Sequence, residues 1–427
     1  MTLTSIEASV LKKISPTKVQ TIDINAKAAS FIKTLSKRIK GAEVILGGSV
    51  AKDTFFVNKT DIDIFVRFDF EIYANQSAKL SDLLQAALKK AFPKIKIQRV
   101  HGSRDYFQLE YYSYKFEIVP ILLISQSLAA VNITDISPLH AVWVNQQPKD
   151  IKNQIRLAKQ FAKAQGCYGA ESYLGGFSGY VLEILTIYYG SFHKLIEASI
   201  KWKIKQVVDV EKHHQGKDVF MEIDLAKLNS PLIVVDPVDK YRNAAAALSK
   251  EKWQRFKNAA KMYLKSPNSS FFKNQELCVE FAELIAKNKK RNLIYLELTA
   301  LVGKPDVVGC KLLKVFDYLK SELAGFGLRE ADWQWSPKET AKLYICTSKK
   351  ILPKGFVKKG PPEKMVEAAQ NFRDKNSKNQ VYSEGGILFA KVAIKTRDLE
   401  SVTKKILKSK YVLEKIRRIK SFTISVQ

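Results

Sequence analysis

The chain has 427 residues, of which 71 are Lys or Arg and 42 are Asp or Glu, so its formal net charge is +29. Hydrophobic residues make up 46 % of the chain, which excludes a mainly disordered protein, and the length predicts about three domains. No apolar run reaches the ~20 residues that a membrane-spanning helix needs, and the N-terminal residues lack the apolar core of a signal peptide. We therefore expect a cytoplasmic protein with no membrane partner. Four widely spaced cysteines without a Cys-x-x-Cys pair argue against a disulfide framework and a structural zinc site.

The excess of positive charge favours a polyanionic partner, and nucleic acid is the usual one. An acidic membrane surface is the competing partner, but neither end of the chain contains a basic amphipathic helix with a bulky apolar face. A second alternative is a lysine-rich proteome, in which many proteins are basic whatever they bind. The charge alone does not decide between these alternatives, so the motifs carry the argument.

The first third of the chain predicts a mixed α/β sheet of five strands. Gly47-Gly48-Ser49 predicts a turn directly after the first strand, and alternating apolar residues in Asp61–Phe68 predict the second strand. Two helices are expected to flank these strands. The expected helices cover residues 19–39 and 77–91, and the strands cover 42–46, 61–68, 94–100, 106–112 and 114–123.

The remainder of the chain divides into a helical region and an alternating one. From residue 148 to 264 the apolar spacing is mainly helical, with a short strand at 232–235. The loop-like sequence at 266–270 marks the expected boundary with the last region. That region is expected to contain strands at 292–298, 332–335 and 342–347, a loop at 352–362, helices at 306–323, 363–373 and 399–410, and a hairpin at 381–394.

The strongest chemical signal is the pair Asp61 and Asp63 on the second predicted strand. Residues two apart on a strand share one face, so these two carboxylates project together while Ile62 and Ile64 point into the core. Adjacent carboxylates raise each other's pKa unless a cation lies between them, and oxygen ligands suit Mg²⁺. The alternative is an exposed strand with two solvated aspartates. Because a glycine turn that can approach a phosphate precedes this pair, we favour metal-assisted phosphoryl transfer.

A third carboxylate, Glu117, lies between apolar residues on the fifth predicted strand. A charge is costly there without a partner, so we expect Glu117 to join Asp61 and Asp63 at a two-metal site. The alternative is a Glu117 side chain that faces solvent beside Lys115.

These motifs resemble the nucleotidyltransferase superfamily that includes DNA polymerase β and poly(A) polymerase. Further blocks at 137–144, 163–171, 176–185 and 234–249 resemble the class I, archaeal-type CCA-adding enzymes, which add C, C and A to the tRNA 3′ end from CTP and ATP. The resemblance implies an α+β multidomain fold in three parts. These are a polymerase β-like nucleotidyltransferase catalytic head over 1–135, a mostly helical central neck over 136–265 that completes the nucleotide site, and an α/β C-terminal body and tail with ferredoxin-like elements over 266–427 that binds tRNA.

The resemblance also assigns roles to individual residues. Asp61, Asp63 and Glu117 match the metal-binding catalytic carboxylates, although the family usually has aspartate at the third position. The expected nucleotide-binding residues occupy the family's phosphate-turn, nucleotide-contact and base-reading positions: Gly48, Ser49, Lys52, His140, Lys163, Ser172 and Arg242. The implied cofactor is Mg²⁺, as two ions, and the implied substrates are CTP and ATP.

Two positions depart from the family pattern. Ser172 stands where a tyrosine is usual, and Gly175 stands where an arginine is usual. Both positions usually help to bind the triphosphate or the base. For single residues a structural role is the alternative: His140 as a buried histidine, and Arg242 as a helix cap or a partner of Asp239.

The C-terminal region is rich in Lys and Arg, and the resemblance assigns it to the tRNA acceptor stem, elbow and 3′ end. A solvated lysine face is the alternative for any one of these residues. The candidates are Lys289, Lys290, Arg291, Lys404, Lys408, Arg417 and Arg418. A homodimer is a further expected state. Other functions that stay open are a poly(A)-type or partial-CCA tailing enzyme, and a catalytically impaired RNA-binding homologue.

Overall fold

The structure is a computed structural model that describes residues 3–57, 61–337 and 339–426. It contains two compact units, Met1–Gln275 and Glu276–Gln427. The expected head and neck regions together form the first unit, and the second unit begins ten residues after the position 266 that the sequence suggested. No helix in the described part of the chain is long and apolar enough to cross a membrane.

The head is built on a five-stranded sheet with the order β1-β2-β5-β4-β3. Its central strands β2 and β5 run parallel, and the other neighbouring strands run antiparallel. The strands are β1 (Ala42–Leu46), β2 (Ile62–Phe68), β3 (Gln98–Val100), β4 (Tyr106–Tyr111) and β5 (Tyr114–Leu122).

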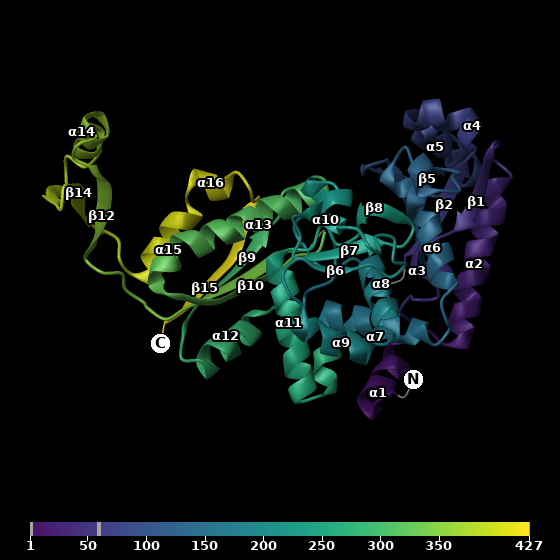
Figure 1. Cartoon of the computed structure of the whole chain (residues 1–427), viewed down its shortest axis with the longest axis horizontal. Coiled ribbons are helices and arrows are strands. Elements are labelled where there is room, and N and C mark those ends of the chain that lie inside the picture. The colour runs from purple at the N-terminus through teal and green to yellow at the C-terminus, as the bar shows by residue number, and fades with distance from the viewer. Residues whose placement is uncertain (1–2, 58–60, 338, 427) are drawn as a thin grey trace. The chain divides into compact units, whose positions relative to one another are not determined.

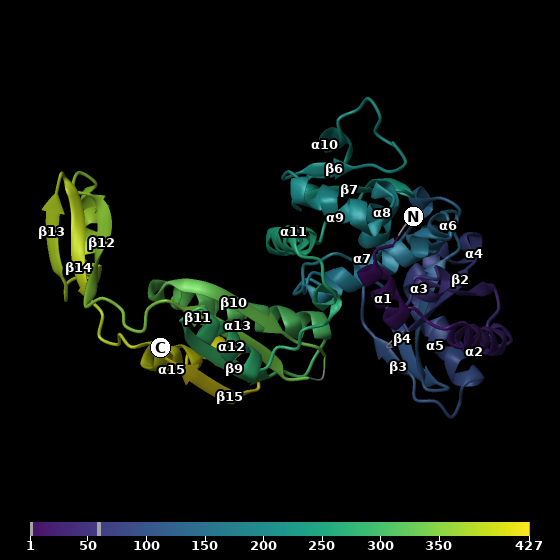
Figure 2. The same cartoon turned by 90° about the horizontal axis from the view of Figure 1, so that it is seen from below.

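One face of this sheet is covered by α2 (Lys18–Ser36) and α5 (Leu80–Ala91), as Figures 1 and 2 show. Ile62 and Ile64 of β2 are fully buried in the resulting core, together with Phe31 of α2. Asp63, between the two isoleucines, is only half-buried and lies on the opposite face. The alternation of DIDIF therefore places the carboxylates where the sequence predicted them.

The neck is mainly helical, as predicted, and its core is aromatic. Phe161, Phe177, Phe192 and Phe256 are buried in one cluster from four different segments. A small sheet with the order β6-β7-β8 packs against the helices. The remaining elements of the first unit are α1 (Ser5–Ile14), α3 (Gly48–Ala51), α4 (Phe70–Tyr73), η1 (Ala74–Lys79), η2 (Ser127–Ala129), η3 (Ile133–Ile136), α6 (Ser137–Asn145), α7 (Ile151–Ala164), α8 (Gly179–Tyr189), α9 (Phe192–Lys201), β6 (Gln206–Val208), α10 (Val219–Glu222), η4 (Leu225–Leu228), β7 (Leu232–Asp236), β8 (Asp239–Asn243), α11 (Lys250–Lys265) and η5 (Ser269–Phe272).

The second unit contains two antiparallel sheets, ordered β10-β11-β9-β15 and β12-β14-β13. Helices α13 and α15 bury their apolar residues against the four-stranded sheet. The elements are α12 (Val279–Asn288), β9 (Asn292–Thr299), α13 (Pro305–Glu322), η6 (Ala324–Phe326), β10 (Leu328–Gln334), β11 (Ala341–Thr347), β12 (Gly355–Pro362), α14 (Val366–Lys375), β13 (Gln380–Glu384), β14 (Ile387–Ala393), α15 (Leu399–Leu407), α16 (Lys410–Leu413) and β15 (Arg418–Ser425).

The prediction of a loop at 352–362 is wrong, because this segment contains the strand β12. β12 is an edge strand paired only with β14, and proline and glycine are tolerated at an edge because one side of the strand needs no hydrogen-bond partner. The sequence analysis also missed β15, whose partner β9 lies far away in the sequence.

Candidate active site

The central feature of the head is a row of polar side chains across β2, β5 and β4. Asp63 of β2 pairs in register with Glu117 of β5, and Glu117 pairs in register with Gln108 of β4. The Gln108 Nε2 donates a hydrogen bond of 2.7 Å to Glu117 Oε1. Asp61 comes directly before β2, two residues from Asp63. The parallel pairing of β2 with β5 therefore brings the three predicted carboxylates to one face of the sheet.

Lys115 connects two of these carboxylates. Its Nζ donates to Asp61 Oδ2 at 3.0 Å and to Glu117 Oε1 at 2.8 Å. The Glu117 side chain is 23 % exposed, so it is neither free in solvent nor turned away from Asp61. A cationic ammonium thus lies between two of the carboxylates that the sequence assigned to metal ions.

Asp63 has a strongly shifted pKa, raised from 3.8 to about 7. Burial is the main cause, and the negative charges of Glu117 and Asp61 add to it, while Lys52 and Lys115 act in the opposite direction. A carboxylate in this position loses its proton readily only when more positive charge is nearby. The site therefore favours binding of a cation.

The glycine turn is fitted closely to Asp63. The backbone N–H of Gly47 donates to the Asp63 carbonyl at 2.8 Å. Gly48 has a φ of +58°, and a Cβ at this position would lie 1.6 Å from Asp63 Oδ2. Gly48 is also the first residue of the short helix α3, which carries Ser49. Only glycine allows the backbone to lie directly against the carboxylate.

Lys52 follows this turn and is held by the neck. Its Nζ lies 2.7 Å from Oε2 of Glu183, a fully buried residue of α8. Glu183 Oε1 also accepts hydrogen bonds from Lys159 Nζ at 2.7 Å and from Thr54 Oγ1 at 3.1 Å. Sequence reasoning assigned a role to Lys52 but missed Glu183 and Lys159. The available signal was a single acidic residue inside the apolar segment 180–187.

Lys163, in the last turn of α7, is the other predicted triphosphate lysine. Its Nζ lies 4.3 Å from the ring centroid of Phe56 and 4.8 Å from that of Tyr168. Burial lowers the pKa of Lys163. Two aromatic faces therefore orient this cation without neutralising it.

His140 and Arg242 meet at a buried aspartate that the sequence analysis did not single out. The Nη1 of Arg242 pairs with Oδ2 of Asp236, and His140 Nε2 lies 3.2 Å from the same oxygen. Tyr180 donates its hydroxyl to Asp236 Oδ1 at 3.0 Å and stacks on the His140 ring with centroids 3.9 Å apart. The expected alternative partner Asp239 is wrong, because Asp239 instead accepts from the backbone of its own turn.

Two further positions are those that depart from the family pattern. Ser172 is exposed in the turn that links α7 to α8, away from regular elements. Gly175, in the same turn, has a φ of +57°, and a Cβ there would lie 3.2 Å from the Ser249 Cβ. Its carbonyl accepts from Ser249 N at 2.8 Å. An arginine at 175 would be strained by this backbone conformation, so the close packing of this turn against the start of α11 requires glycine.

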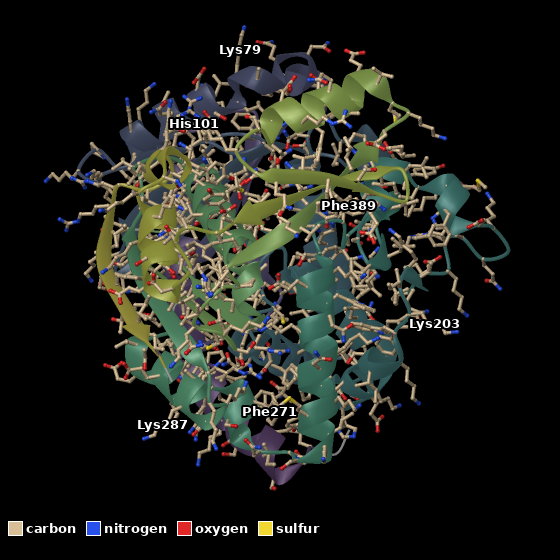
Figure 3. The ribbon with its side chains drawn as sticks, turned by 90° about the vertical axis from the view of Figure 1, so that its left-hand side faces the viewer. Lys79, His101, Lys203, Phe271, Lys287 and Phe389 are labelled. Atoms are coloured by element: carbon tan, nitrogen blue, oxygen red, sulfur yellow. The ribbon has the colours of Figure 1, made fainter. Side chains whose placement is uncertain are left out.

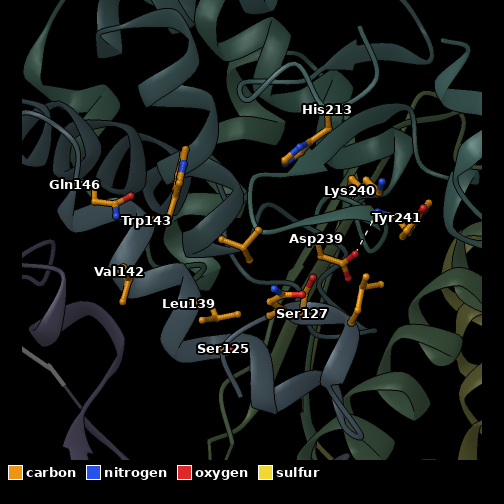
Figure 4. A pocket seen from close by; sticks show the side chains of 13 residues that line it. Ser125, Ser127, Leu139, Val142, Trp143, Gln146, His213, Asp239, Lys240 and Tyr241 are labelled. Carbon is orange, nitrogen blue, oxygen red and sulfur yellow. Dashed lines mark hydrogen bonds between the residues drawn. The ribbon is translucent and has the colours of Figure 1, made fainter. Parts of the chain in front are cut away.

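A cavity of about 380 Å³ lies next to the residues around Asp236. Figure 4 shows Leu139, Val142 and Trp143 of α6 on one side of it, and Asp239 and Tyr241 of the β7–β8 hairpin on the other. His140 and Arg242 belong to the same two elements, but none of the three carboxylates of the head lines this cavity. The cavity and the head carboxylates are therefore distinct parts of the candidate site.

The head carboxylates fit a divalent metal in their chemistry. Within the described residues, no three His, Cys, Asp or Glu side chains are already gathered as metal ligands. In the head, Lys115 takes up the contacts of Asp61 and Glu117 that a cation would make. The oxygen donors and the raised pKa of Asp63 are compatible in type with a hard divalent cation at this face of the sheet.

The basic candidates of the second unit fall into two groups. Lys289 and Arg291 both pair with Glu330, and Lys404 pairs with Glu400 at 2.6 Å. Lys290, Lys408, Arg417 and Arg418 are exposed at the surface. Lysines of both units point outward, as Figure 3 shows for Lys79, Lys203 and Lys287 at the rim of the view.

Comparison with known proteins gives consistent matches over most of the chain. Residues 28–133 match the nucleotidyltransferase domain, and residues 153–273 match the second domain of tRNA nucleotidyltransferases. The CCA-adding enzyme of Nanoarchaeum equitans is 38 % identical over 340 residues, which cover 78 % of this chain and 80 % of that protein. The CCA-adding enzyme of Saccharolobus islandicus is 28 % identical over 417 residues, which cover 96 % and 94 % of the two chains.

Among solved structures, one neighbour shares the fold over part of the chain. The Cid1 poly(U) polymerase aligns with a TM-score of 0.51 at 14 % identity, over 63 % of this chain and 98 % of that chain. At this identity the likeness shows the fold alone.

Proposed function

The chain belongs to the family of CCA-adding enzymes, and on that premise we propose that Asp61, Asp63 and Glu117 hold the two Mg²⁺ ions of its reaction. It is a template-independent tRNA nucleotidyltransferase that adds C, C and A to the tRNA 3′ end. The match to CCA-adding enzymes along most of the chain supports this activity over poly(A)-type tailing and over a silent RNA-binding homologue. A cytoplasmic location is proposed because tRNA is the substrate.

The three carboxylates supply the negative charge that such ions need. When bound, Mg²⁺ would lower the pKa of the RNA 3′-hydroxyl and offset the charge of the departing pyrophosphate. Asp63 lies at the centre of the set, between Glu117 in the neighbouring strand and the glycine turn. Gln108 fixes the longer Glu117 side chain from the far side. These contacts support the proposal that a glutamate serves where the family usually has aspartate.

The triphosphate of CTP or ATP is proposed to lie beside the glycine turn. Gly48 leaves room for it at the backbone, and Ser49 adds a hydroxyl at the start of α3. Lys52 and Lys163 would offset the phosphate charges. Lys52 directly follows the glycine turn and α3, and the Lys163 ammonium is oriented by the rings of Phe56 and Tyr168.

The base is proposed to be read on the neck side. Asp236 holds the Arg242 guanidinium by one nitrogen, which leaves its other donors for a base edge. His140 is fixed between Asp236 and the ring of Tyr180. Ser172 is the weakest of the proposed contacts, since it is exposed in a turn outside the buried cluster.

The tRNA is proposed to use the basic surface of the second unit for its acceptor stem and elbow. The exposed residues Lys290, Lys408, Arg417 and Arg418 are the best candidates, because Lys289 and Lys404 already have acidic partners. Contacts of this kind bind the phosphate backbone and position an RNA by its shape. A homodimer is proposed as the oligomeric state of the protein.

The observation that carries the metal proposal is the register pair of Asp63 with Glu117, with Lys115 bridging Glu117 to Asp61. The test is isothermal titration of the protein with Mn²⁺ as a probe in the absence of nucleotide and RNA. We expect binding that is lost in Asp63→Asn and kept in Glu43→Gln, an exposed carboxylate variant on β1. Equal binding by both variants would place the ions elsewhere.

A further inference from the structure

The buried carboxylate of Glu183 joins three segments of the first unit. Its Oε2 accepts from Lys52 of the segment after the glycine turn, and its Oε1 accepts from Lys159 of α7, both at 2.7 Å. Thr54 Oγ1 donates to Oε1 and accepts from Lys159. The side chain of Glu183 has no exposed surface, so its charge depends wholly on these contacts.

The two lysines that contact Glu183 are not equivalent. The Lys159 side chain is 4 % exposed and lies inside the neck. The Lys52 side chain is 12 % exposed, and its charge reaches Asp63, where it lowers the pKa of that carboxyl. Only Lys52 therefore borders the catalytic carboxylates, while Lys159 is enclosed.

One carboxylate with two ammonium groups has one partner more than charge balance requires. Burial raises the pKa of Glu183, but Lys159 and Lys52 outweigh it and lower the pKa to about 2. Breaking a buried ion pair by removal of its only partner is strongly destabilising. With Lys159 in place, Lys52 can leave without stranding the charge of Glu183.

We propose that Glu183 is a positioning residue that holds Lys52 beside the catalytic carboxylates until a nucleoside triphosphate takes it over, while Lys159 keeps Glu183 paired after the transfer. This inference rests on the proposed nucleotide site, because it assigns Lys52 to the triphosphate. No bond is made or broken: the Lys52 ammonium exchanges a carboxylate partner for a phosphate partner. Glu183 and Lys159 then control nucleotide affinity without touching the nucleotide.

The proposal predicts an unusual pattern of affinities. In Lys159→Met, release of Lys52 strands the Glu183 carboxylate, so ATP binding weakens by about tenfold or more. Adding Glu183→Gln to that variant removes the charge that would be stranded, so most of the affinity returns. A merely structural role of the buried cluster predicts the opposite, since a second substitution in a core usually adds damage.

The measurement is equilibrium dialysis of ATP with Mg²⁺ against the full chain in the absence of tRNA, so that no transfer occurs. The matched control is Lys257→Met, which removes a partly buried lysine of α11 whose Nζ donates to the carbonyl of Trp202. That control should keep the wild-type ATP affinity. Circular dichroism and thermal unfolding confirm that each variant is folded, and Lys159→Gln replaces Lys159→Met if the latter is not.

Recovery of ATP affinity in the double variant supports the proposal. Wild-type affinity in the folded Lys159 variant overturns it, and so does a double variant that binds no better than the single one. If the variants show the predicted loss and recovery of ATP affinity but the wild-type chain adds no nucleotide to tRNA, the proposed function is overturned and the exchange of partners by Lys52 stands. If the wild-type chain adds CCA but ATP affinity does not recover in the double variant, only the exchange is overturned.

Discussion

A Cβ on Gly48 would lie 1.6 Å from Oδ2 of Asp63, so the glycine turn and the central carboxylate occupy one continuous space. The backbone at Gly48 also has a φ of +58°, which residues with a side chain rarely adopt. The glycine turn and the strand β2, separate motifs in the sequence, thus form a single structural unit.

Gly48→Ala should therefore impair both folding and activity. We expect a loss of about 2–4 kcal/mol in the free energy of unfolding, from backbone strain and from displacement of Asp63, and a nearly complete loss of nucleotide addition. Urea unfolding and a tRNA extension assay measure the two effects. The matched control is Gly190→Ala, because Gly190 has a φ of +82° with nothing within 4 Å of its Cβ position. Equal losses in both variants would show that only backbone strain matters.

Asp63→Asn and Asp61→Asn should each lower the rate of nucleotide addition by about 1000-fold or more, since each removes a charge proposed to hold the metal ions. Single-turnover extension of a tRNA substrate measures the rate, and filter binding measures tRNA affinity, which should change little. Near wild-type rates in either variant would contradict the assignment. Glu43→Gln, an exposed carboxylate on β1, serves as the control.

Glu117→Gln should reduce the turnover rate far more than it weakens ATP binding, because Glu117 is proposed to hold the metal that acts on the 3′-hydroxyl. Glu117→Asp should retain only part of the activity. The shorter side chain withdraws from both Gln108 and Lys115, which hold Glu117 in the structure. Turnover number and KM for ATP, measured separately, distinguish this outcome from a pure binding defect, which would raise KM alone.

The free energy of unfolding should depend on pH through the carboxyl group of Asp236. Burial raises its pKa, but His140 and Arg242 outweigh burial and lower the pKa from 3.8 to about 2. A lowered pKa stabilises the folded state above pH 3.8, and this stabilisation is lost as the pH falls toward 2. Asp236→Asn should therefore be destabilised at pH 7 by an amount that shrinks below pH 4. Urea unfolding across this range checks it, and a pH-independent difference would contradict it.

The affinity for tRNA should fall steeply with salt. A chain with a net charge of +29 releases counterions from the RNA when its lysines and arginines bind phosphates. Charge reversal at Arg417 and Arg418 should weaken binding and reduce the slope of log affinity against log salt. Reversal at Lys404, which pairs with Glu400, should do less. An affinity that hardly changes from low to physiological salt would remove the electrostatic argument.

The sequence could predict the parts of the site that follow from local periodicity. Alternation in Asp61–Phe68 placed Asp63 opposite Ile62 and Ile64, and the structure has the same faces. The sequence also led us to expect Glu117 beside Asp61 and Asp63, but it gave neither the parallel register of β2 with β5 nor the pairing of β15 with β9. Short strand signals give no register, because register is decided by the packing of the whole sheet.

The partners of the buried ionic groups could also not be predicted from the sequence. Glu183 lies among apolar residues of a helix, where its pattern does not distinguish a paired charge from a helix surface residue. Its partners Lys52 and Lys159 come from two other segments, so only the tertiary structure unites them. For Arg242, two aspartates were near in sequence, and the β7–β8 turn uses Asp239 for its own backbone, which leaves Asp236 as the partner.

The most direct test of the account is addition to three tRNA substrates that end before CCA, after C and after CC, each given Mg²⁺ with CTP alone or ATP alone. The account predicts that CTP extends the first two and ATP extends the third, with one A, and that Asp63→Asn extends none. Addition of the same nucleotide to all three ends, or of a long tail from either nucleotide, would contradict it.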